Sequence, residues 1–332
     1  MSRGREQGYA SAMAITAEQK AGYKAPSQAE SWVYFDGEFK QYKDVHLGLM
    51  THALHYGTGC FEGIRAYWNE SQGQLFCLLM EAHFKRLRNS AKIIKIDLPY
   101  SVDQMVEATL EVMRRNGYRE DVYIRPFAFK SQEEIGVRLH GLRDSFAIYT
   151  APFGNYIDTD SGIRCMVSSW RRIDDNAAPA RAKVTGIYIN SALAKTEANE
   201  NGFDEAIVLT QEGHVSEGSA ENLFIVRDGV LITPPASDNI LEGVTRNVIS
   251  TLAREDLGLT VVERSIDRSE LYVADELFLC GTGAQVSAVI EVDRRKIGDG
   301  QPGPITRDLQ KLYFDVVKGR VEERLDWLHP VY

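Results

Sequence analysis

The chain has 332 residues, of which 44% are hydrophobic and 26% are charged, and these proportions are typical of a folded protein with a sizeable core. Its formal net charge of -9 argues against a protein whose main task is to bind DNA or RNA. It has no uninterrupted run of about 18 apolar residues, the length that a membrane-spanning helix needs.

The N-terminal segment and the cysteines indicate the compartment. Residues 1–30 lack the apolar core of a signal peptide, and we expect them to form a flexible extension. The four cysteines form no CxxC pair, which favours buried, reduced thiols in a cytoplasmic protein. His52 and His55 are three residues apart, but no cysteine or carboxylate cluster joins them, so we expect no metal site.

Residues 31–150 show both strand and helix patterns and predict a small α/β domain. Asp36-Gly37 is typical of a hairpin turn after the first strand. Apolar residues at helical spacing indicate a helix over 81–94, and Gly117 ends a second helix. The expected strands are 31–35, 61–67, 75–79, 122–129 and 145–150, and the expected helices are 81–94 and 102–116.

The remainder of the chain predicts a larger, strand-rich domain. Residues 151–162 contain proline, glycine and aspartate and read as the interdomain loop. The region 163–332 favours a barrel-like sheet flanked by helices, so the whole chain belongs to the α/β (α+β) class. The expected strands are 164–170, 205–209, 223–226, 230–232, 260–264 and 276–280, and the expected helices are 187–199, 245–255 and 305–324.

Two charged residues are candidates for chemistry. Lys183 lies among small residues beside Arg181, a setting that favours the uncharged amine a nucleophile requires. Glu217 lies between small residues and glycine, where a carboxylate can approach a ligand closely. Each residue is, on its local pattern alone, more often a solvated surface charge, and that alternative stays open at this point.

Two glycine-containing segments are candidate anion sites. Residues 242–246 open a helix, whose first amides and the Thr245 hydroxyl favour a phosphate. Residues 281–284 follow a strand and offer a similar concavity of backbone amides. Arg86, on the helix over 81–94, could bind a phosphate or be an ordinary solvated charge.

Several blocks in this order resemble the branched-chain amino acid aminotransferases, which are fold-type IV, pyridoxal-phosphate-dependent enzymes of the class IV aminotransferase family. The resemblance runs from about residue 31 onward and depends most on the FEGIRAY and SEGSAENLF blocks. The blocks are HALHYGTGCFEGIRAY (52–67), HFKRLRNSAK (83–92), YIRP (123–126), MVSSW (166–170), AKVTGIYINS (182–191), VSEGSAENLF (215–224), LEGVTR (241–246) and ELYVADELFLCGTGAQV (270–286).

The resemblance implies a role for each matching residue. Lys183 matches the lysine that bonds covalently to pyridoxal 5'-phosphate and moves the substrate proton. Glu217 matches the carboxylate that faces the pyridine nitrogen, and Tyr188 matches the tyrosine that hydrogen-bonds the phenolic oxygen of the cofactor. The implied phosphate-binding residues are Arg86, Val244, Thr245 and Thr282. The implied substrate-binding residues are Tyr56, Phe61, Tyr123, Arg125, Tyr156, Thr282 and Gly283.

The resemblance also implies the reaction and the assembly. We expect transfer of the amino group between leucine, isoleucine or valine and 2-oxoglutarate, in a homodimer or higher homo-oligomer with its active site at the dimer interface. Arg125, with Tyr56 of the partner subunit, would bind the γ-carboxylate of glutamate. A broad-range, (R)-amine or D-amino acid transaminase on the same fold stays an alternative, as does a non-catalytic protein that binds the cofactor.

Four positions depart from the family pattern. Val184-Thr185 stand where many relatives carry smaller residues, Phe153 where some carry tryptophan, and Gly283 where alanine is common. These differences concern the range of substrates rather than the cofactor.

Overall fold

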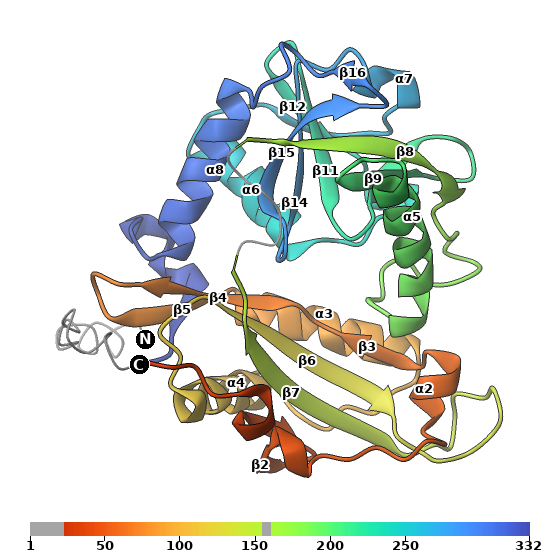
Figure 1. Cartoon of the computed structure of the whole chain (residues 1–332), viewed down its shortest axis with the longest axis vertical. Coiled ribbons are helices and arrows are strands. Elements are labelled where there is room, and N and C mark those ends of the chain that lie inside the picture. The colour runs from red at the N-terminus through yellow and green to blue at the C-terminus, as the bar shows by residue number, and fades with distance from the viewer. Residues whose placement is uncertain (1–22, 155–160) are drawn as a thin grey trace.

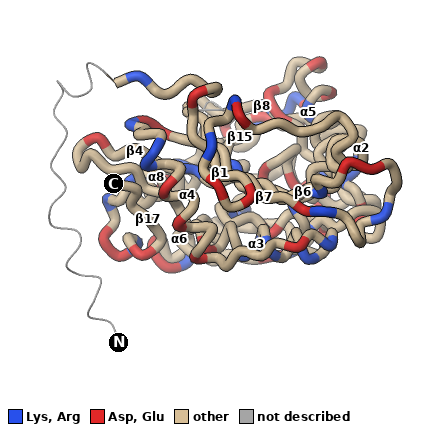
Figure 2. Tube along the Cα trace, turned by 90° about the horizontal axis from the view of Figure 1, so that it is seen from below, with Lys and Arg blue, Asp and Glu red and all other residues tan. Residues whose placement is uncertain are grey.

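The computed structural model describes residues 23–154 and 161–332. Figure 1 shows two β-sheets in separate layers, with the strands of residues 32–152 below and those of residues 163–296 above. Figure 2 shows acidic and basic residues interspersed along the described chain rather than separated onto different faces. No helix among the described residues is long and apolar enough to cross a membrane.

The first sheet is antiparallel throughout, in the order β17-β5-β4-β6-β7-β1-β2, with β3 also paired to β6. The expected hairpin is confirmed, because β1 and β2 pair across Asp36 and Gly37, which both have positive φ. Its strands are β1 (Trp32–Phe35), β2 (Glu38–Gln41), β3 (Gly59–Phe61), β4 (Ile64–Asn69), β5 (Gln74–Leu78), β6 (Val122–Lys130), β7 (Asp144–Pro152) and β17 (Leu328–Pro330).

Helices α3 (Met80–Ile93) and α4 (Val102–Asn116) pack against each other, and their buried residues share one apolar core with this sheet. The start of α4 is fixed by a capping box, in which the side chains and backbone amides of Ser101 and Gln104 bond reciprocally. Gly117 ends α4 in the left-handed conformation, with φ of 61°.

The second sheet has the order β10-β9-β8-β15-β14-β11-β12-β13, with β16 paired to β15. It is mixed, because β8 runs parallel to β9 and β15 while β14 runs antiparallel to β11 and β15. Its strands are β8 (Ile163–Arg171), β9 (Glu205–Leu209), β10 (Val215–Gly218), β11 (Asn222–Arg227), β12 (Val230–Thr233), β13 (Val261–Glu263), β14 (Glu276–Gly281), β15 (Gln285–Val292) and β16 (Arg295–Lys296).

Helices surround the second sheet. Helix α5 packs on β8 and β9, whereas α6 and α8 pack together against β14 and β15. The apolar cluster of the sheet itself includes Ile163, Ile207, Leu223 and Leu279. The other helices are α2 (His52–Tyr56), α5 (Tyr188–Glu200), α6 (Val244–Glu255), α7 (Arg268–Leu271) and α8 (Pro304–Val317), and the 3-10 helices are η1 (Gln28–Glu30), η2 (Tyr42–Asp44), η3 (Thr185–Ile187), η4 (Ala236–Asp238) and η5 (Glu322–Trp327).

The end of the described chain returns to the first sheet. Strand β17 pairs with β5, and the side chain of Gln74 bonds the backbone of Val331 and Tyr332. The hydroxyls of Tyr67 on β4 and Tyr313 on α8 lie 2.8 Å apart in a buried hydrogen bond. Residues beyond 300 therefore stabilise both layers.

The predicted α/β class is confirmed, and so are the buried, free cysteines. The predicted helix over 305–324 is too long: α8 ends at Val317, because Gly319 turns the chain with φ of 68°. Elements α2, α7, β2, β3, β10, β15, β16 and β17 were not among the expected helices and strands. The division into domains at residues 151–162 stays a prediction.

Candidate active site

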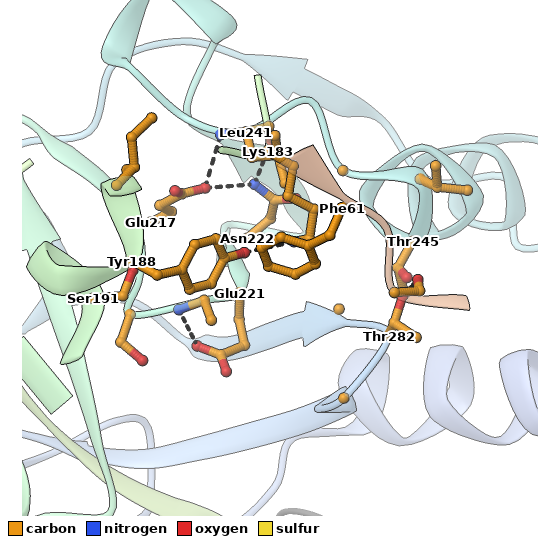
Figure 3. Close-up of a pocket in the computed structure, with 18 of the residues that line it drawn as sticks. Phe61, Lys183, Tyr188, Ser191, Glu217, Glu221, Asn222, Leu241, Thr245 and Thr282 are labelled. Atoms are coloured by element: carbon orange, nitrogen blue, oxygen red, sulfur yellow. Dashed lines mark hydrogen bonds between the residues drawn. The ribbon is translucent and has the colours of Figure 1, made fainter. Parts of the chain in front are cut away.

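A cavity of about 640 Å³ lies between the two sheets. Figure 3 shows Glu217 at one end of it and Thr245 and Thr282 at the other, with Lys183 and Phe61 between them. The predicted site residues that line it are Phe61, Arg86, Tyr123, Arg125, Lys183, Tyr188, Glu217, Val244, Thr245, Thr282 and Gly283. Strands and helices far apart in the sequence thus bring most of the predicted residues together.

The backbone of Lys183 is fixed on both sides. Its amide donates to the Ser90 hydroxyl at 3.1 Å, and its carbonyl accepts from the Phe61 amide at 3.1 Å. Its Nζ atom donates to the Tyr188 hydroxyl at 2.7 Å and lies 5.2 Å from the centre of the Phe61 ring. Lys183 is therefore an amine directed into the cavity between two aromatic side chains, and Arg181 pairs instead with Glu242.

Glu217 lies inside strand β10, which was not among the expected strands. Its side chain is buried, and its Oε1 atom lies 2.9 Å from Nη2 of Arg172. The Oε2 atom accepts from the Asn222 side chain at 3.2 Å and from the Leu241 amide at 3.0 Å. Burial raises the pKa of Glu217, while Arg172 and the Leu241 amide oppose that rise.

Arg172 and Asn222 are functional neighbours of Glu217 that sequence reasoning did not identify. Arg172 follows β8, far along the chain from Glu217, so no local pattern indicates the ion pair. Asn222 belongs to the SEGSAENLF block and bonds both Glu217 and the Leu241 carbonyl. Its position in that block was the one available signal.

The opposite end of the cavity presents amides and hydroxyls. Helix α6 begins at Val244, and its N-cap, Gly243, makes no side-chain hydrogen bond to the first turn. The first amides of an α-helix have no partner within it, and the helix dipole favours an anion there. Thr245 adds a hydroxyl, while the Thr282 hydroxyl donates to the Gly63 carbonyl at 2.8 Å.

Arg125 projects from β6 into the aromatic part of the cavity. Its guanidinium carbon lies 4.3 Å from the centre of the Phe61 ring, and its Nη2 atom donates to the Tyr123 hydroxyl at 2.9 Å. Its Nε atom is buried, with no hydrogen-bond partner among the described residues. Arg125 is only partly buried and lines the cavity, so the outward N–H groups of its guanidinium can bind a carboxylate.

Two predicted substrate residues are not part of this arrangement. Tyr56 ends α2 outside the cavity, and its hydroxyl accepts from the Gly136 amide at 3.1 Å. Helix α2 ends at Tyr56, and the hydrogen bond to Gly136 places that side chain beside the loop between β6 and β7. Tyr156 lies outside the described residues.

Comparisons with known proteins decide the family. The family model described as "Amino-transferase class IV" matches residues 59–292. The chain belongs to this family. The predicted family resemblance and fold class are therefore confirmed.

This aminotransferase is similar to named relatives over almost its whole length. It is 49% identical over 301 residues to the "Probable branched-chain-amino-acid aminotransferase" of Aquifex aeolicus, covering 91% of this chain and 97% of that one. The branched-chain aminotransferase structure of Thermoproteus uzoniensis with norvaline has a TM-score of 0.87 and 46% identity, over 91% of this chain and 99% of the other. The PLP form of the Thermobaculum terrenum enzyme has a TM-score of 0.88 and 38% identity, over 92% and 100%.

The departures from the family pattern lie at the cavity of this aminotransferase. Phe153, Val184, Thr185 and Gly283 all line it. The Thr185 hydroxyl donates to the Gly57 carbonyl at 2.8 Å and joins η3 to the end of α2. No group of three or more histidine, cysteine, aspartate or glutamate side chains suited to a metal ion occurs in residues 23–154 and 161–332.

Proposed function

We propose that this aminotransferase moves the amino group between branched-chain L-amino acids and 2-oxoglutarate. The observation that carries the proposal is the Lys183 amine, 2.7 Å from the Tyr188 hydroxyl, in one cavity with buried Glu217 and the start of α6. The names of the similar proteins, which are branched-chain aminotransferases, support this substrate class.

The cavity fits pyridoxal 5'-phosphate as cofactor. Lys183 would bond to its aldehyde, Tyr188 would donate to its phenolic oxygen, and Glu217 would face its ring nitrogen. The phosphate would lie at Arg86, the first amides of α6 and the Thr245 and Thr282 hydroxyls. When bound, the cofactor supplies a ring that accepts the electrons released at the substrate α-carbon.

The side chains of this chain perform the proton transfers. The Lys183 amine, once free, would take a proton from the substrate α-carbon, and in the reverse half of the cycle it would give a proton to the α-carbon of the second substrate. The Tyr188 hydroxyl holds the amine in position, and Glu217 keeps a proton on the ring nitrogen. The amino group of the first substrate stays on the enzyme until 2-oxoglutarate accepts it, so the two substrates react in alternation.

The substrate pocket serves both an aliphatic and an acidic side chain. The rings of Phe61 and Tyr188, with centres 4.9 Å apart, provide an apolar wall. Arg125 would bind the γ-carboxylate of glutamate through the outward N–H groups of its guanidinium. The amides of Thr282 and Gly283 would bind the α-carboxylate, and Tyr156 would complete the pocket.

A homodimer agrees with the surface around α2. Leu49, Leu54, Ile135 and Val137 are 61–88% exposed in the single chain. They lie in neighbouring segments, because Thr51 bridges to Glu133 and His52 bonds the Gly136 carbonyl. Burial of these side chains against a second copy would bring Tyr56 towards the active site of the partner subunit.

We place the enzyme in the cytoplasm, since its four cysteines are free and buried.

An absorbance experiment tests the function. The purified enzyme should be yellow from bound cofactor, and leucine should bleach that absorbance while 2-oxoglutarate restores it. Initial rates with D-alanine and (R)-1-phenylethylamine should be much lower than with leucine. Faster turnover of either compound would favour the corresponding alternative specificity, and an enzyme that leucine leaves yellow would contradict transamination of leucine.

The variant Lys183→Ala tests the catalytic amine. Without a side-chain amine, no group at this position can remove the α-proton, and general base catalysis contributes about 10²–10⁴-fold. We expect turnover of leucine to be lost. The matched control is Lys195→Ala. It removes an amine of α5 that pairs with Glu205 of β9 and does not line the cavity, so most of the activity should remain. Appreciable transamination by the first variant would refute the assignment.

A further inference from the structure

The carboxylate of Glu62 is completely buried near the end of the cavity where α6 begins, and it binds two residues of helix α3. Nε of Arg86 donates to its Oε1 atom at 2.8 Å, and Nη2 of Arg86 donates to its Oε2 atom at 2.7 Å. Nδ1 of His83 lies 2.7 Å from Oε2. A carboxylate held at both oxygens by the same guanidinium fixes the plane of that guanidinium.

The hydrogen bonds of Arg86 leave two directed donors. A guanidinium has five N–H groups, and three of those in Arg86 bond Glu62 and the Glu242 carbonyl, the latter at 2.8 Å through Nη1. Each terminal nitrogen keeps one N–H that has no partner among the residues that the structure describes. Arg86 lines the cavity next to Val244 and Thr245, so these donors belong to the same end as the first turn of α6.

We propose that Glu62 is a positioning residue for cofactor binding, which holds the Arg86 guanidinium so that its two remaining N–H groups meet the phosphate. The inference rests on the proposed role of Arg86 as a phosphate ligand. Glu62 itself touches no substrate, and its effect passes entirely through Arg86.

His83 and Arg86 also keep the Glu62 carboxylate charged. Burial favours the protonated form, but the charge and hydrogen bonds of Arg86, together with the hydrogen bond from His83, lower the pKa of Glu62 to about 2. Burial lowers the pKa of His83, so its ring is neutral and Nδ1 donates its hydrogen to the carboxylate. The anchor is therefore in place throughout the neutral pH range.

Orientation and charge make opposite predictions for this pair. Glu62 offsets the positive charge of Arg86, so a purely electrostatic effect would make the enzyme bind phosphate more tightly once Glu62 is neutralised. If Glu62 orients Arg86, neutralising it must weaken phosphate binding. The amide of Glu62→Gln has one acceptor oxygen and turns an NH₂ group towards a guanidinium donor, so the paired geometry is lost while the side-chain volume is kept.

The test compares two ligands that differ only by the phosphate. The full-length enzyme is freed of cofactor and titrated by absorbance with pyridoxal 5'-phosphate and, separately, with pyridoxal. For Glu62→Gln we expect the dissociation constant of pyridoxal 5'-phosphate to rise about tenfold, which is the effect of losing one charged hydrogen bond. The constant for pyridoxal should stay within about twofold of the unmodified enzyme. Arg86→Ala should show the same split, with a larger loss.

Asp144→Asn is the matched control, because it also neutralises a paired carboxylate in the first sheet. Oδ1 of Asp144 lies 2.8 Å from Nζ of buried Lys130, and neither residue lines the cavity. It should change neither dissociation constant. Unchanged or tighter binding of pyridoxal 5'-phosphate by Glu62→Gln would overturn the proposal, and so would equal weakening for both ligands. If only Arg86→Ala weakens binding, the positioning role fails and the phosphate role stands. If Arg86→Ala has no effect, both fail.

His83→Gln provides a second route if Glu62→Gln does not fold. It removes the ring that holds Oε2 of Glu62 and leaves the carboxylate bound to Arg86. We expect a smaller loss, in the same direction and restricted to pyridoxal 5'-phosphate. If His83→Gln binds each ligand as tightly as the unmodified enzyme does, the proposal is overturned in that case.

Discussion

At Glu217, three donors from three segments of the chain converge on one buried carboxylate. Arg172 bonds one oxygen, and Asn222 and the Leu241 amide bond the other. Such donors stabilise the charged form against the cost of burial. The carboxylate can thus face a ring nitrogen as an anion whose position is fixed by the protein.

The variant Glu217→Gln should slow turnover while the cofactor stays bound. A hydrogen bond to a charged group contributes about 1.5–3 kcal/mol, so kcat with leucine should fall by about ten- to a hundredfold. Stopped-flow absorbance measures the rate of the reaction with leucine, and the cofactor content of the purified variant shows whether the cofactor stays bound. The exposed-turn variant Glu212→Gln is the control and should keep full activity. An unchanged rate in Glu217→Gln would remove Glu217 from this role.

Glu221 should make stability depend on pH. Burial, and after it the charge of Glu205, raises the pKa of Glu221. The folded state then holds this proton more tightly than the unfolded chain, so stability falls as the pH rises from the ordinary carboxylate range through the raised pKa. Glutamine stays neutral and has no such loss.

We therefore expect Glu221→Gln to gain stability relative to the unmodified enzyme between pH 5 and pH 9, by about 1.4 kcal/mol for each unit by which the pKa is raised. Urea unfolding at the two pH values measures the difference. Glu212→Gln, on an exposed turn, should show a constant difference. Parallel loss of stability by Glu221→Gln and the unmodified enzyme would contradict the predicted titration.

At the residue scale, the sequence identified the groups that lie in family motifs and missed their partners. Lys183 and Glu217 stand in blocks that resemble the family, and both line the cavity. Glu62 and Arg172 are both buried, and Glu62 even stands in the FEGIRAY block, but the residues that they pair with lie far along the chain. The spacing in the sequence contains no record of such contacts, because the fold creates them.

Among the elements, the junction of α2 with η3 depends on a glycine. Gly57 ends α2 with φ of 62°, and a Cβ atom there would lie 2.5 Å from Cα of Gly186. The Gly186 amide also donates to the Gly57 carbonyl at 3.1 Å. This close approach fixes η3, which begins two residues after Lys183.

Gly57→Ala should destabilise the protein more than Gly117→Ala. Both glycines have left-handed φ, 62° and 61°, but a Cβ atom at Gly117 meets nothing within 4 Å. The backbone effect is thus common to both, and the additional loss at Gly57 is the overlap with Gly186, about 1–3 kcal/mol. Thermal unfolding measures both. Equal losses would show that η3 moves away without cost.

Local signals determined how well each element was predicted. Helix α4 was predicted with its observed bounds, since Gly117 marks its end in the sequence, and the structure adds the capping box of Ser101 and Gln104 at its start. Strand β10 was missed, because Ser216, Glu217 and Gly218 are untypical of strands and only the pairing with β9 makes them extended. Short β17 depends in the same way on its partner β5.

For the whole molecule, the apolar surface around α2 predicts the assembly. Ile135 and Val137 are 79% and 80% exposed in the single chain. We expect Ile135→Asp and Val137→Asp to raise the dissociation constant of the dimer by about a hundredfold or more, since an unpaired buried charge costs about 3–5 kcal/mol. Activity should fall with the dimer, because Tyr56 would be supplied by the partner subunit.

Analytical ultracentrifugation at micromolar concentration measures this change. Val273→Asp is the control, because Val273 is 61% exposed but follows α7 in the second layer. It should leave the assembly unchanged. A dimer that persists in both Ile135→Asp and Val137→Asp would exclude this surface as the interface.

The pairing of β17 with β5 has a consequence for biosynthesis. Ribosomes make the chain from the N-terminus, so residues 32–152 emerge long before residues 328–330 can join them at the edge of the first sheet. Until then β5 has a free edge, and its apolar residues Phe76 and Leu78 lack the cluster they share with α8. The nascent enzyme is therefore most open to aggregation and chaperone binding while residues 153–327 are being made, and the first sheet is complete only when β17 joins β5.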